Sequence, residues 1–298
     1  MFKKIGVKVT VYVNVLLLIV MVVGAWFLVG QQSQHLEQQL LERGKIEAIL
    51  GARFTGRILE EAIDNGVFSV KDAFDTEYEE IPGFVPAKYH TRYDFYLDKA
   101  LLAIEDEFLK DESVVFAVAV DVNGYLPTHN TLYQQPITGD VEKDKTGNRT
   151  KRIFNDPVGL NAAQNLEEGF LQVYARDTGE TMWDISAPIM VKGKHWGAFR
   201  IGFSLAKVNQ QKMLLQQSLM ITLLTILVIS IVAVVVTVGR ALHPLEKLTQ
   251  AASDLADGKV DEAITAESKD EVGKLADALE RLRVSLKVAM DRLRKKKT

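Results

Sequence analysis

The chain has 298 residues, with 36 Lys and Arg side chains against 39 Asp and Glu side chains, a formal net charge of −3 and a charged fraction of 25%. This balance excludes a disordered polyelectrolyte and a protein that coats nucleic acid, so we expect no nucleic-acid partner. The chain has no cysteine, which also excludes a disulfide framework, a thiolate zinc site, an iron–sulfur cluster, a catalytic thiol and haem attached through a Cys-x-x-Cys-His motif.

Two apolar segments are long enough to cross a membrane as helices. Residues 9–34 carry no charged side chain over 26 positions, and residues 213–239 carry none over 27, whereas a spanning helix needs about 20. The first segment could instead be a cleaved signal peptide. Its apolar part, however, exceeds the usual length of about 7 to 15 residues and ends at the bulky Trp26. The sequence therefore predicts uncleaved transmembrane helices at residues 9–30 and 216–239.

The distribution of charge predicts the orientation in the membrane. Residues 1–8 carry a net charge of +3, residues 31–212 carry 20 basic and 28 acidic groups, and residues 240–298 carry 13 basic and 11 acidic groups. Because basic residues next to a span favour the cytoplasmic side, we expect both termini in the cytoplasm and residues 31–215 outside it. A long external segment without cysteine is typical of a bacterial envelope protein, so the predicted location is the bacterial cytoplasmic (inner) membrane.

Hydrophobic periodicity predicts an α+β domain between the two spans. Apolar residues repeat at three- and four-residue spacing in residues 31–65 and 93–110, which indicates a helix that continues from the first span and a second helix. Alternating and continuous apolar runs follow, separated by turn signals, and these are typical of strands. The longest connection, residues 130–169, is expected to serve a site or to hold small helices. We expect a five-stranded antiparallel sheet with strands at residues 114–120, from Tyr125 to Pro127, and at residues 170–176, 182–191 and 195–205, with turns at residues 121–124, 177–179 and 192–194.

Three segments of this domain resemble the extracytoplasmic part of methyl-accepting chemotaxis receptors. They are residues 120–130 (VDVNGYLPTHN), 148–156 (NRTKRIFND) and 195–202 (HWGAFRIG). The layout, in which a long helix leads into a sheet, resembles the Cache and PAS-like sensor domains of bacterial receptors. The resemblance implies an extracytoplasmic Cache/PAS-like domain whose sheet encloses a small molecule, and a role in chemotaxis signalling.

A second helical pattern follows the second span. Pro244 stands where proline can open a helix without the loss of a needed donor, and Gly258 ends that helix. Apolar residues then repeat alternately at three and four positions through residues 272–293, which is the seam of a coiled coil. Two such helices expose more apolar surface than one hairpin can cover, so we expect two chains to bury it as a four-helix bundle.

This arrangement, over residues 240–293, resembles the HAMP linker of bacterial transducers. The shared features are an opening proline, a glycine after the first helix, two apolar residues in the connector and an Asp-Glu-x-Gly sequence that begins at Asp270. A connector of about 14 residues favours a parallel helix pair over an antiparallel hairpin with a tight turn. The resemblance implies a signal relay formed by Pro244, Leu245, Leu248, Gly258, Val260, Ile264, Glu271, Gly273, Leu275 and Leu279.

The sequence contains no recognisable output domain. Chemotaxis receptors continue from this linker into a long helical hairpin, whereas this sequence ends in the basic residues 294–298, and it has no phosphate-binding loop, phospho-accepting histidine box or cyclase signature. We therefore expect either a separate partner, a cytoplasmic signalling protein or a full-length receptor, or a truncated sequence. The basic tail could bind anionic membrane lipid, or it could be a solvated helix end.

Candidate ligand-binding residues lie in the strands and in the long connection. Arg149 and Arg152 would offer paired cations to the carboxylate of an unknown small molecule. The alternatives are that Asp121 only builds a turn, that the arginines pair with Asp156 or Asp184, and that the tryptophans belong to the core. The full set of candidates is Asp121, Tyr125, His129, Asn130, Arg149, Arg152, Trp183, Asp184 and Arg200.

A metal site, a haem site and a catalytic site have weaker support in the sequence. His90, His129 and His195 could hold a metal or a non-covalent haem, which the resemblance implies for some relatives, but they lack motif spacing. No nucleophile–base pair or carboxylate cluster has an informative spacing. We therefore expect no resident metal, no cofactor and no enzyme activity.

Three functional hypotheses follow from these patterns. The first is a homodimeric transmembrane sensor, in which binding of a small molecule shifts the population of two states and the HAMP linker passes the change to a partner. The second is a haem or redox sensor on the same scaffold. The third is a non-sensory membrane adaptor that presents its HAMP helices to another transducer.

Overall fold

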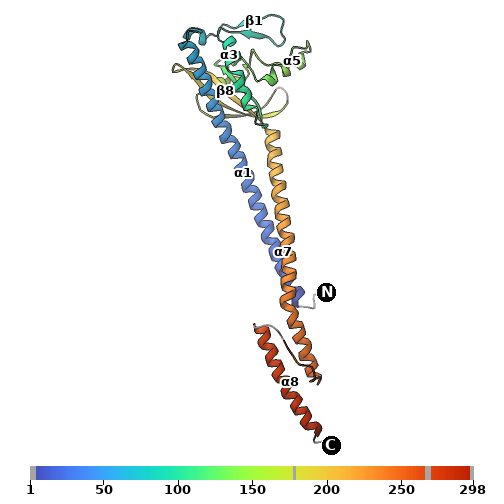
Figure 1. The fold of residues 1–298 in the computed structure, drawn as a ribbon. Helices are drawn as coiled ribbons and strands as arrows, with labels where there is room; N and C mark the ends of the chain where they lie inside the picture. The colour runs from blue at the N-terminus through green and yellow to red at the C-terminus, as the bar shows by residue number, and fades with distance from the viewer. Residues whose placement is uncertain (1–4, 177–178, 266–269, 296–298) are drawn as a thin grey trace. The chain divides into compact units, whose positions relative to one another are not determined.

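The computed structural model describes residues 5–176, 179–265 and 270–295. The first two residues of the predicted turn at 177–179 and the last three residues of the basic tail lie outside this range. The chain divides into a sheet unit, Val29–Gln217, and a helical unit formed by Met1–Leu28 and Ser218–Thr298. The long helices α1 (Ile5–Asp64) and α7 (Leu205–Ala256) belong to both units (Figure 1).

Both long helices contain a stretch that is long and apolar enough to cross a membrane. In each of them an 18-residue window holds at most two charged side chains, and none of either window is buried inside the protein. Unburied apolar helices of this length are stable only in a nonpolar solvent, because they expose a continuous hydrophobic surface. The two predicted apolar spans are therefore present as helices.

The centre of the sheet unit is a four-stranded antiparallel sheet in the order β3-β8-β7-β6. Its strands are β3 (Val114–Asp121), β6 (Phe170–Ala175), β7 (Thr181–Val191) and β8 (Lys194–Ser204). The prediction of a fifth strand in this sheet is wrong, because β4 (Tyr125–Leu126) leaves it and pairs with β5 (Arg152–Ile153).

On the outer edge of β3, side chains and not another strand accept the hydrogen bonds of the backbone N–H groups. The backbone N–H of Ala117 donates to Oδ1 of Asn130 (2.9 Å), and that of Ala119 donates to Oε1 of Glu105 (3.1 Å). Burial raises the pKa of Glu105 well above its usual value, an effect that the Ala119 N–H opposes. These acceptors occupy donors that a fifth strand would need, so the edge is closed to further pairing.

Small elements surround the sheet. The predicted helix at residues 93–110 is divided at Leu101 into two short helices, and the long connection after β4 holds short helices, as expected. They are α2 (Val70–Ala73), α3 (Asp94–Ala100), α4 (Leu102–Phe108), η1 (Thr131–Tyr133), α5 (Val141–Gly147) and α6 (Pro157–Gln164), and a separate hairpin is formed by β1 (Glu79–Ile81) and β2 (Lys88–His90).

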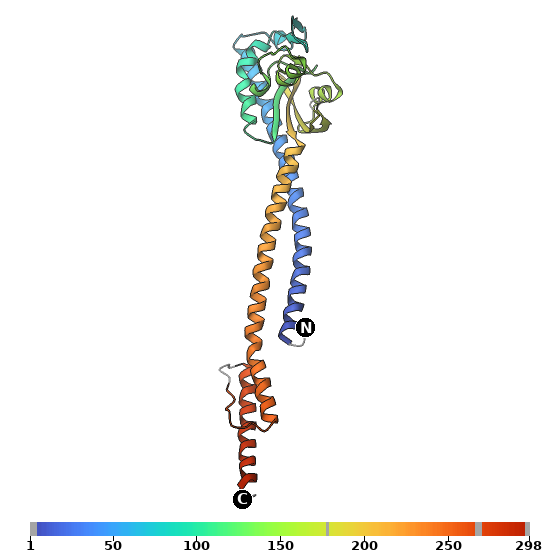
Figure 2. The ribbon, with the colours of Figure 1, turned by 90° about the vertical axis from the view of Figure 1, so that its right-hand side faces the viewer.

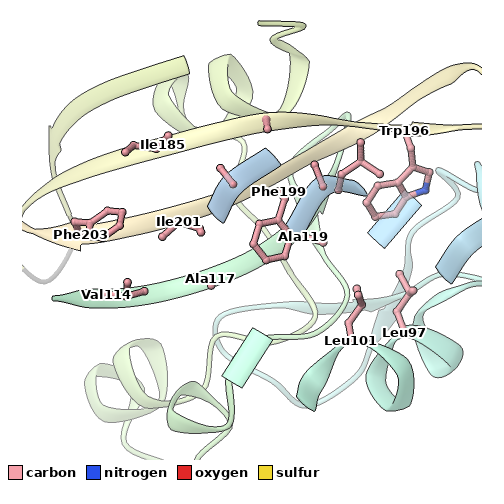
Figure 3. Packing of buried hydrophobic residues seen from close by; sticks show 14 of the residues in the cluster. Leu97, Leu101, Val114, Ala117, Ala119, Ile185, Trp196, Phe199, Ile201 and Phe203 are labelled. Carbon is pink, nitrogen blue, oxygen red and sulfur yellow. The ribbon is translucent and has the colours of Figure 1, made fainter. Parts of the chain in front are cut away.

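One face of the sheet packs against α1, α3 and α4. Phe199, Ile201 and Phe203 of β8 and Ile185 of β7 lie in this core together with Leu97 and Leu101, as Figure 3 shows. The alternation predicted for the last two strands is thereby confirmed, since the odd-numbered residues of both strands face the core. Of the even-numbered residues, Met182 and Ala198 pack on the other side of the sheet, whereas Trp196 near the start of β8 lies in the core.

Helix α1 approaches the sheet through glycines. A Cβ atom on Gly51 would lie 2.3 Å from the Phe199 ring, and one on Gly56 would lie 2.5 Å from the backbone oxygen of Met190. Both distances are shorter than any real contact of a Cβ atom, so the helix can lie this close to the sheet only without side chains there.

In the helical unit, α7 ends at Ala256, two residues before Gly258, and α8 (Glu271–Lys295) follows after a connector. Gly258 has a φ of +82° and donates its N–H to Leu255, while the N–H of Lys259 donates to Asp254, which is a helix end that favours glycine. Figure 2 shows that α8 runs in the same direction as the end of α7. The two helices therefore form the predicted parallel pair.

Replacement of Gly56 by alanine tests the contact between α1 and the sheet. We expect Gly56→Ala to destabilise the sheet unit by about 1 to 3 kcal/mol, because a backbone carbonyl cannot move aside as a flexible side chain can. Thermal unfolding of the full chain, followed by the fluorescence of Trp183 and Trp196 in the core, measures the loss. Gly30→Ala in the same helix, where nothing lies within 4 Å, is the control and should lose no stability. Equal stability of the two variants would contradict the close packing.

Candidate ligand-binding site

A cavity of about 470 Å³ lies on the face of the sheet that is turned away from α1. Phe116 and Val118 of β3 and Arg200 of β8 line it, and these positions alternate with the core residues Ala117 and Phe199. The long connection after β4 and the end of β6 provide the remaining walls. The charged and aromatic lining residues are Phe116, His129, Arg149, Arg152, Phe154, Asp156, Tyr174, Arg176 and Arg200.

The described lining of the cavity is basic, since it holds four guanidinium groups and one carboxylate. All four arginines lie over aromatic rings. The guanidinium carbons of Arg149 and Arg152 are 4.9 and 5.0 Å from the centre of the Phe154 ring, that of Arg176 is 4.9 Å from the Tyr133 ring, and that of Arg200 is 5.9 Å from the Phe116 ring. Stacking on a ring fixes the plane of a guanidinium group. Such an arrangement favours the binding of an anion.

Lys151 positions the segment that carries two of these arginines. Its backbone has a φ of 61°, which is rare for a residue other than glycine. Its Nζ atom lies 3.1 Å from the buried carboxylate of Asp94 and 2.7 Å from that of Asp98. Lys151 is therefore anchored in carboxylates that do not line the cavity, while Arg149 and Arg152 line it.

Arg200 is held differently, by a carboxylate from the neighbouring strand. Its Nη2 and Nε atoms donate to Oδ2 of Asp184 at 2.5 and 3.2 Å, and the two side chains are almost completely buried. Because a buried charge must be paired, Asp184 is the group that allows Arg200 to stay charged on this face of the sheet.

His129 is a completely buried, uncharged member of the site. Burial lowers the pKa of its imidazole well below its usual value, and the nearby Arg149 and Arg176 lower it further. The ring packs against Tyr133 in a tilted arrangement, with 4.6 Å between the ring centres. His129 therefore adds a neutral, polar edge to a wall that is otherwise positively charged.

Four of the nine predicted ligand-binding residues line this cavity, namely His129, Arg149, Arg152 and Arg200. Asp184 lies next to it as the partner of Arg200. The sequence interpretation missed Phe116, Phe154, Tyr174 and Arg176. The available signal was the alternation of β6, which places Tyr174 at the side of the sheet opposite the core.

The other four predicted residues have structural roles away from the cavity lining. Asp121 accepts hydrogen bonds from the hydroxyls of Tyr78 and Tyr93 and from two backbone N–H groups of its own turn, so its oxygens are occupied. Burial raises the pKa of Asp121, and these hydrogen bonds oppose the rise. Asp121 therefore builds the turn, which was the alternative interpretation of its position.

Tyr125, Asn130 and Trp183 are likewise part of the packed interior. The Tyr125 hydroxyl donates to the backbone oxygen of Tyr89 (2.8 Å), and Asn130 closes the edge of β3. Trp183 is an odd-numbered residue of β7 and lies in the core on the α1 side. None of the three is in contact with the cavity.

The three candidate metal or haem histidines occupy different environments. His90 lies 2.8 Å from the Asp94 carboxylate through Nδ1, His129 lines the cavity, and His195 is at the start of β8. In the part of the chain that the structure describes, no three His, Cys, Asp or Glu side chains form a group that could hold a metal ion.

The residues of the predicted relay lie in α7, the connector and α8. The expectation that Pro244 opens a new helix is wrong, because Pro244 lies inside the continuous α7, where only the backbone oxygen of Arg240 loses its usual donor. Asp270, by contrast, starts α8, since its Oδ1 accepts the N–H groups of Val272 and Gly273.

A buried seam and a pair of charged residues hold the connector to the helices. Leu248, Val260 and Ala276 are buried. Arg283, which the sequence interpretation did not single out, donates to the backbone oxygen of Val260 (2.6 Å), and Glu280 accepts the N–H of Ile264 (2.8 Å). The hydrogen bonds from Arg283 and Ile264 lower the pKa of Glu280 to about 2.

Part of the apolar seam has no cover within one chain. Leu275 and Leu282 of α8 are 45% and 51% exposed, and Leu245 of α7 is also exposed. Leu279 is half-buried, and so are Ile264 and Val272. One helix pair therefore leaves an apolar stripe on its surface, as the sequence pattern predicts.

Residues 236–288 match the HAMP domain family. The prediction of a HAMP linker is confirmed. The HAMP domain follows a sheet domain that stands between two long apolar helices in the chain, which is the organisation of a membrane signal-transduction sensor. No curated protein matches the chain.

The chain also has similarities to solved structures. One is the sensor domain of E. coli DcuS, with 22% identity and a TM-score of 0.27 over 37% of this chain and 71% of that one. Another is an extracellular ligand-binding receptor from Desulfohalobium retbaense, with 12% identity and a TM-score of 0.33 over 62% and 26%. A third is the ligand-binding domain of the Campylobacter jejuni chemoreceptor Tlp3 in complex with L-valine, with 12% identity and a TM-score of 0.30 over 60% and 66%. The chain spans less than two thirds of the second and third structures.

The neutral state of His129 predicts a loss of stability at mildly acidic pH. Below the usual pKa of 6.5, the unfolded chain binds a proton at this residue whereas the buried ring does not. The free energy of unfolding should then fall by up to about 1.4 kcal/mol per pH unit. We expect His129→Gln to show a shallower decrease of Tm between pH 7 and pH 5 than the parent chain, as measured by calorimetry. His35→Gln, at an exposed position of α1, is the control, and identical slopes in all three proteins would contradict the prediction.

Proposed function

We propose that this chain is a transmembrane signal transducer that senses a small anionic molecule outside the cytoplasmic membrane and passes the signal through its HAMP domain to a separate cytoplasmic partner. The observation that carries the proposal is the excess of guanidinium groups over carboxylates among the described residues that line a cavity of about 470 Å³. A carboxylate, phosphate or sulfate group is the kind of ligand that planar guanidinium donors bind most strongly.

The connection between the cavity and the membrane span is covalent and short. Strand β8, which contributes Arg200, ends at Ser204, and α7 begins at the next residue. The Ser204 hydroxyl accepts the N–H of Lys207 (3.3 Å) in the first turn of this helix. A ligand that fits one arrangement of β8 better than another would therefore shift the position or tilt of α7.

The output step requires a second chain and a partner. We infer a homodimer, because the exposed leucines of α8 would be buried in a four-helix bundle of two HAMP domains. The inferred orientation places both termini in the cytoplasm, where the HAMP domain can meet a signalling protein or a full-length receptor.

Ligand binding can be measured with the full chain in lipid nanodiscs. We expect at least one member of a panel of short mono- and dicarboxylates, inorganic phosphate and sulfate to raise the Tm of the sheet unit, while neutral sugars and amines of similar size do not. Arg152→Gln should weaken the binding at least tenfold, because it removes a charged donor from the cavity. Arg57→Gln, at an exposed site on α1, should bind as the parent chain does. Failure of every anion to bind would refute the anion-sensor proposal and favour a non-sensory adaptor.

Cysteine cross-linking tests the inferred homodimer, and the absence of native cysteine makes the result simple to interpret. We expect Leu282→Cys to form a disulfide-linked dimer in membranes treated with a mild oxidant, because this position lies in the exposed apolar seam. Asp277→Cys, on the other side of α8, should form much less. Equal cross-linking at the two positions, or none at either, would contradict a HAMP bundle of two chains.

A further inference from the structure

The buried ion pair between Asp184 and Arg200 differs from the other charged contacts of the cavity. Asp184 accepts hydrogen bonds from Nε and Nη2 of Arg200 through both of its oxygens, and its side chain is completely inaccessible to solvent. Asp156, the carboxylate among the described lining residues, has another role, since its Oδ1 accepts the first N–H groups of α6. Asp184 is thus the carboxylate that is committed to Arg200.

In this pair, one side of the Arg200 guanidinium group faces the cavity. Arg200 lines the cavity, whereas Asp184 does not. All of the hydrogen bonds between the two residues use Nε and Nη2, and Nη1 makes none with the described residues. An anion in the cavity would therefore meet Arg200 from the side opposite Asp184, and the two anions would share one cation.

We propose that Asp184 is the resident counter-anion of the cavity, which competes with the ligand for Arg200 and so lowers its affinity and sets the concentration at which the sensor responds. This inference rests on the proposed anion-sensing function. A ligand anion and Asp184 on either side of one guanidinium group repel each other, and the repulsion is weakly screened because Asp184 is out of contact with water.

The alternative is that Asp184 only holds Arg200 in place. The two roles predict opposite effects of charge removal. If Asp184 competes, its neutralisation frees Arg200 and adds one positive charge to the site, so anions bind more tightly. If Asp184 only holds Arg200 in place, its neutralisation releases the Arg200 side chain, and anions bind more weakly.

The deciding variant is Asp184→Asn, studied as the full chain in nanodiscs with the same anion panel. We expect it to bind the anion that binds best to the parent chain at least tenfold more tightly, by titration calorimetry. Asp64→Asn, which removes an exposed carboxylate that pairs with Lys192, is the matched control and should leave the affinity unchanged. Equal or weaker binding by Asp184→Asn would overturn the inference and leave the proposed function intact.

A second variant covers the case in which Asp184→Asn does not fold, since an unpaired buried arginine is costly. Asp184→Asn combined with Arg200→Gln removes both charges and keeps the net charge of the site. We expect affinity within threefold of the parent chain, because the competitor and the cation that it occupies disappear together. A loss greater than threefold would identify Arg200 as an anchor that Asp184 merely supports. Absence of anion binding to the parent chain itself would overturn both this inference and the proposed function.

Discussion

The close contact of α1 with the sheet determines which face of the sheet can hold a ligand. Glycines at positions 51 and 56 allow the helix to lie against Phe199 and the backbone of Met190, so that α1 covers this face. Because neighbouring residues of a strand point to opposite sides, every charged residue at an even position of β7 and β8 must then face away from α1. The basic cavity is thus a consequence of the apolar packing on the other side.

Much of the fold is readable from the sequence because its signals are local. The strands β7 and β8 alternate clearly, and Gly258 and Asp270 mark helix ends by their chemistry. The four-stranded sheet was not predictable in this way. Glu105 and Asn130, which close the edge of β3, are brought to it by tertiary contacts, and no sequence pattern near β3 predicts them.

The candidate site was partly predictable for the same reason. Arg149 and Arg152 stand out as a pair of cations in a long connection, and both line the cavity. Trp183 was a poor candidate for ligand binding, because the alternation of apolar residues in β7 puts it on the same face as the apolar Ile185. The rings that stack under the arginines, such as Phe154 and Tyr133, depend on tertiary contacts between the connection and the sheet, and sequence spacing carries no information about them.

The arrangement of the arginines explains how a small cavity can hold four of them. A flexible arginine loses considerable side-chain entropy when it binds an anion, and a buried one must also be neutralised. Rings under Arg149, Arg152 and Arg176 restrict the side chains before binding, while Asp184 neutralises Arg200. Only Arg200 belongs to the strand that leads directly into α7. Any change in the balance of charge around Arg200 therefore acts on the strand that continues into the membrane-spanning helix.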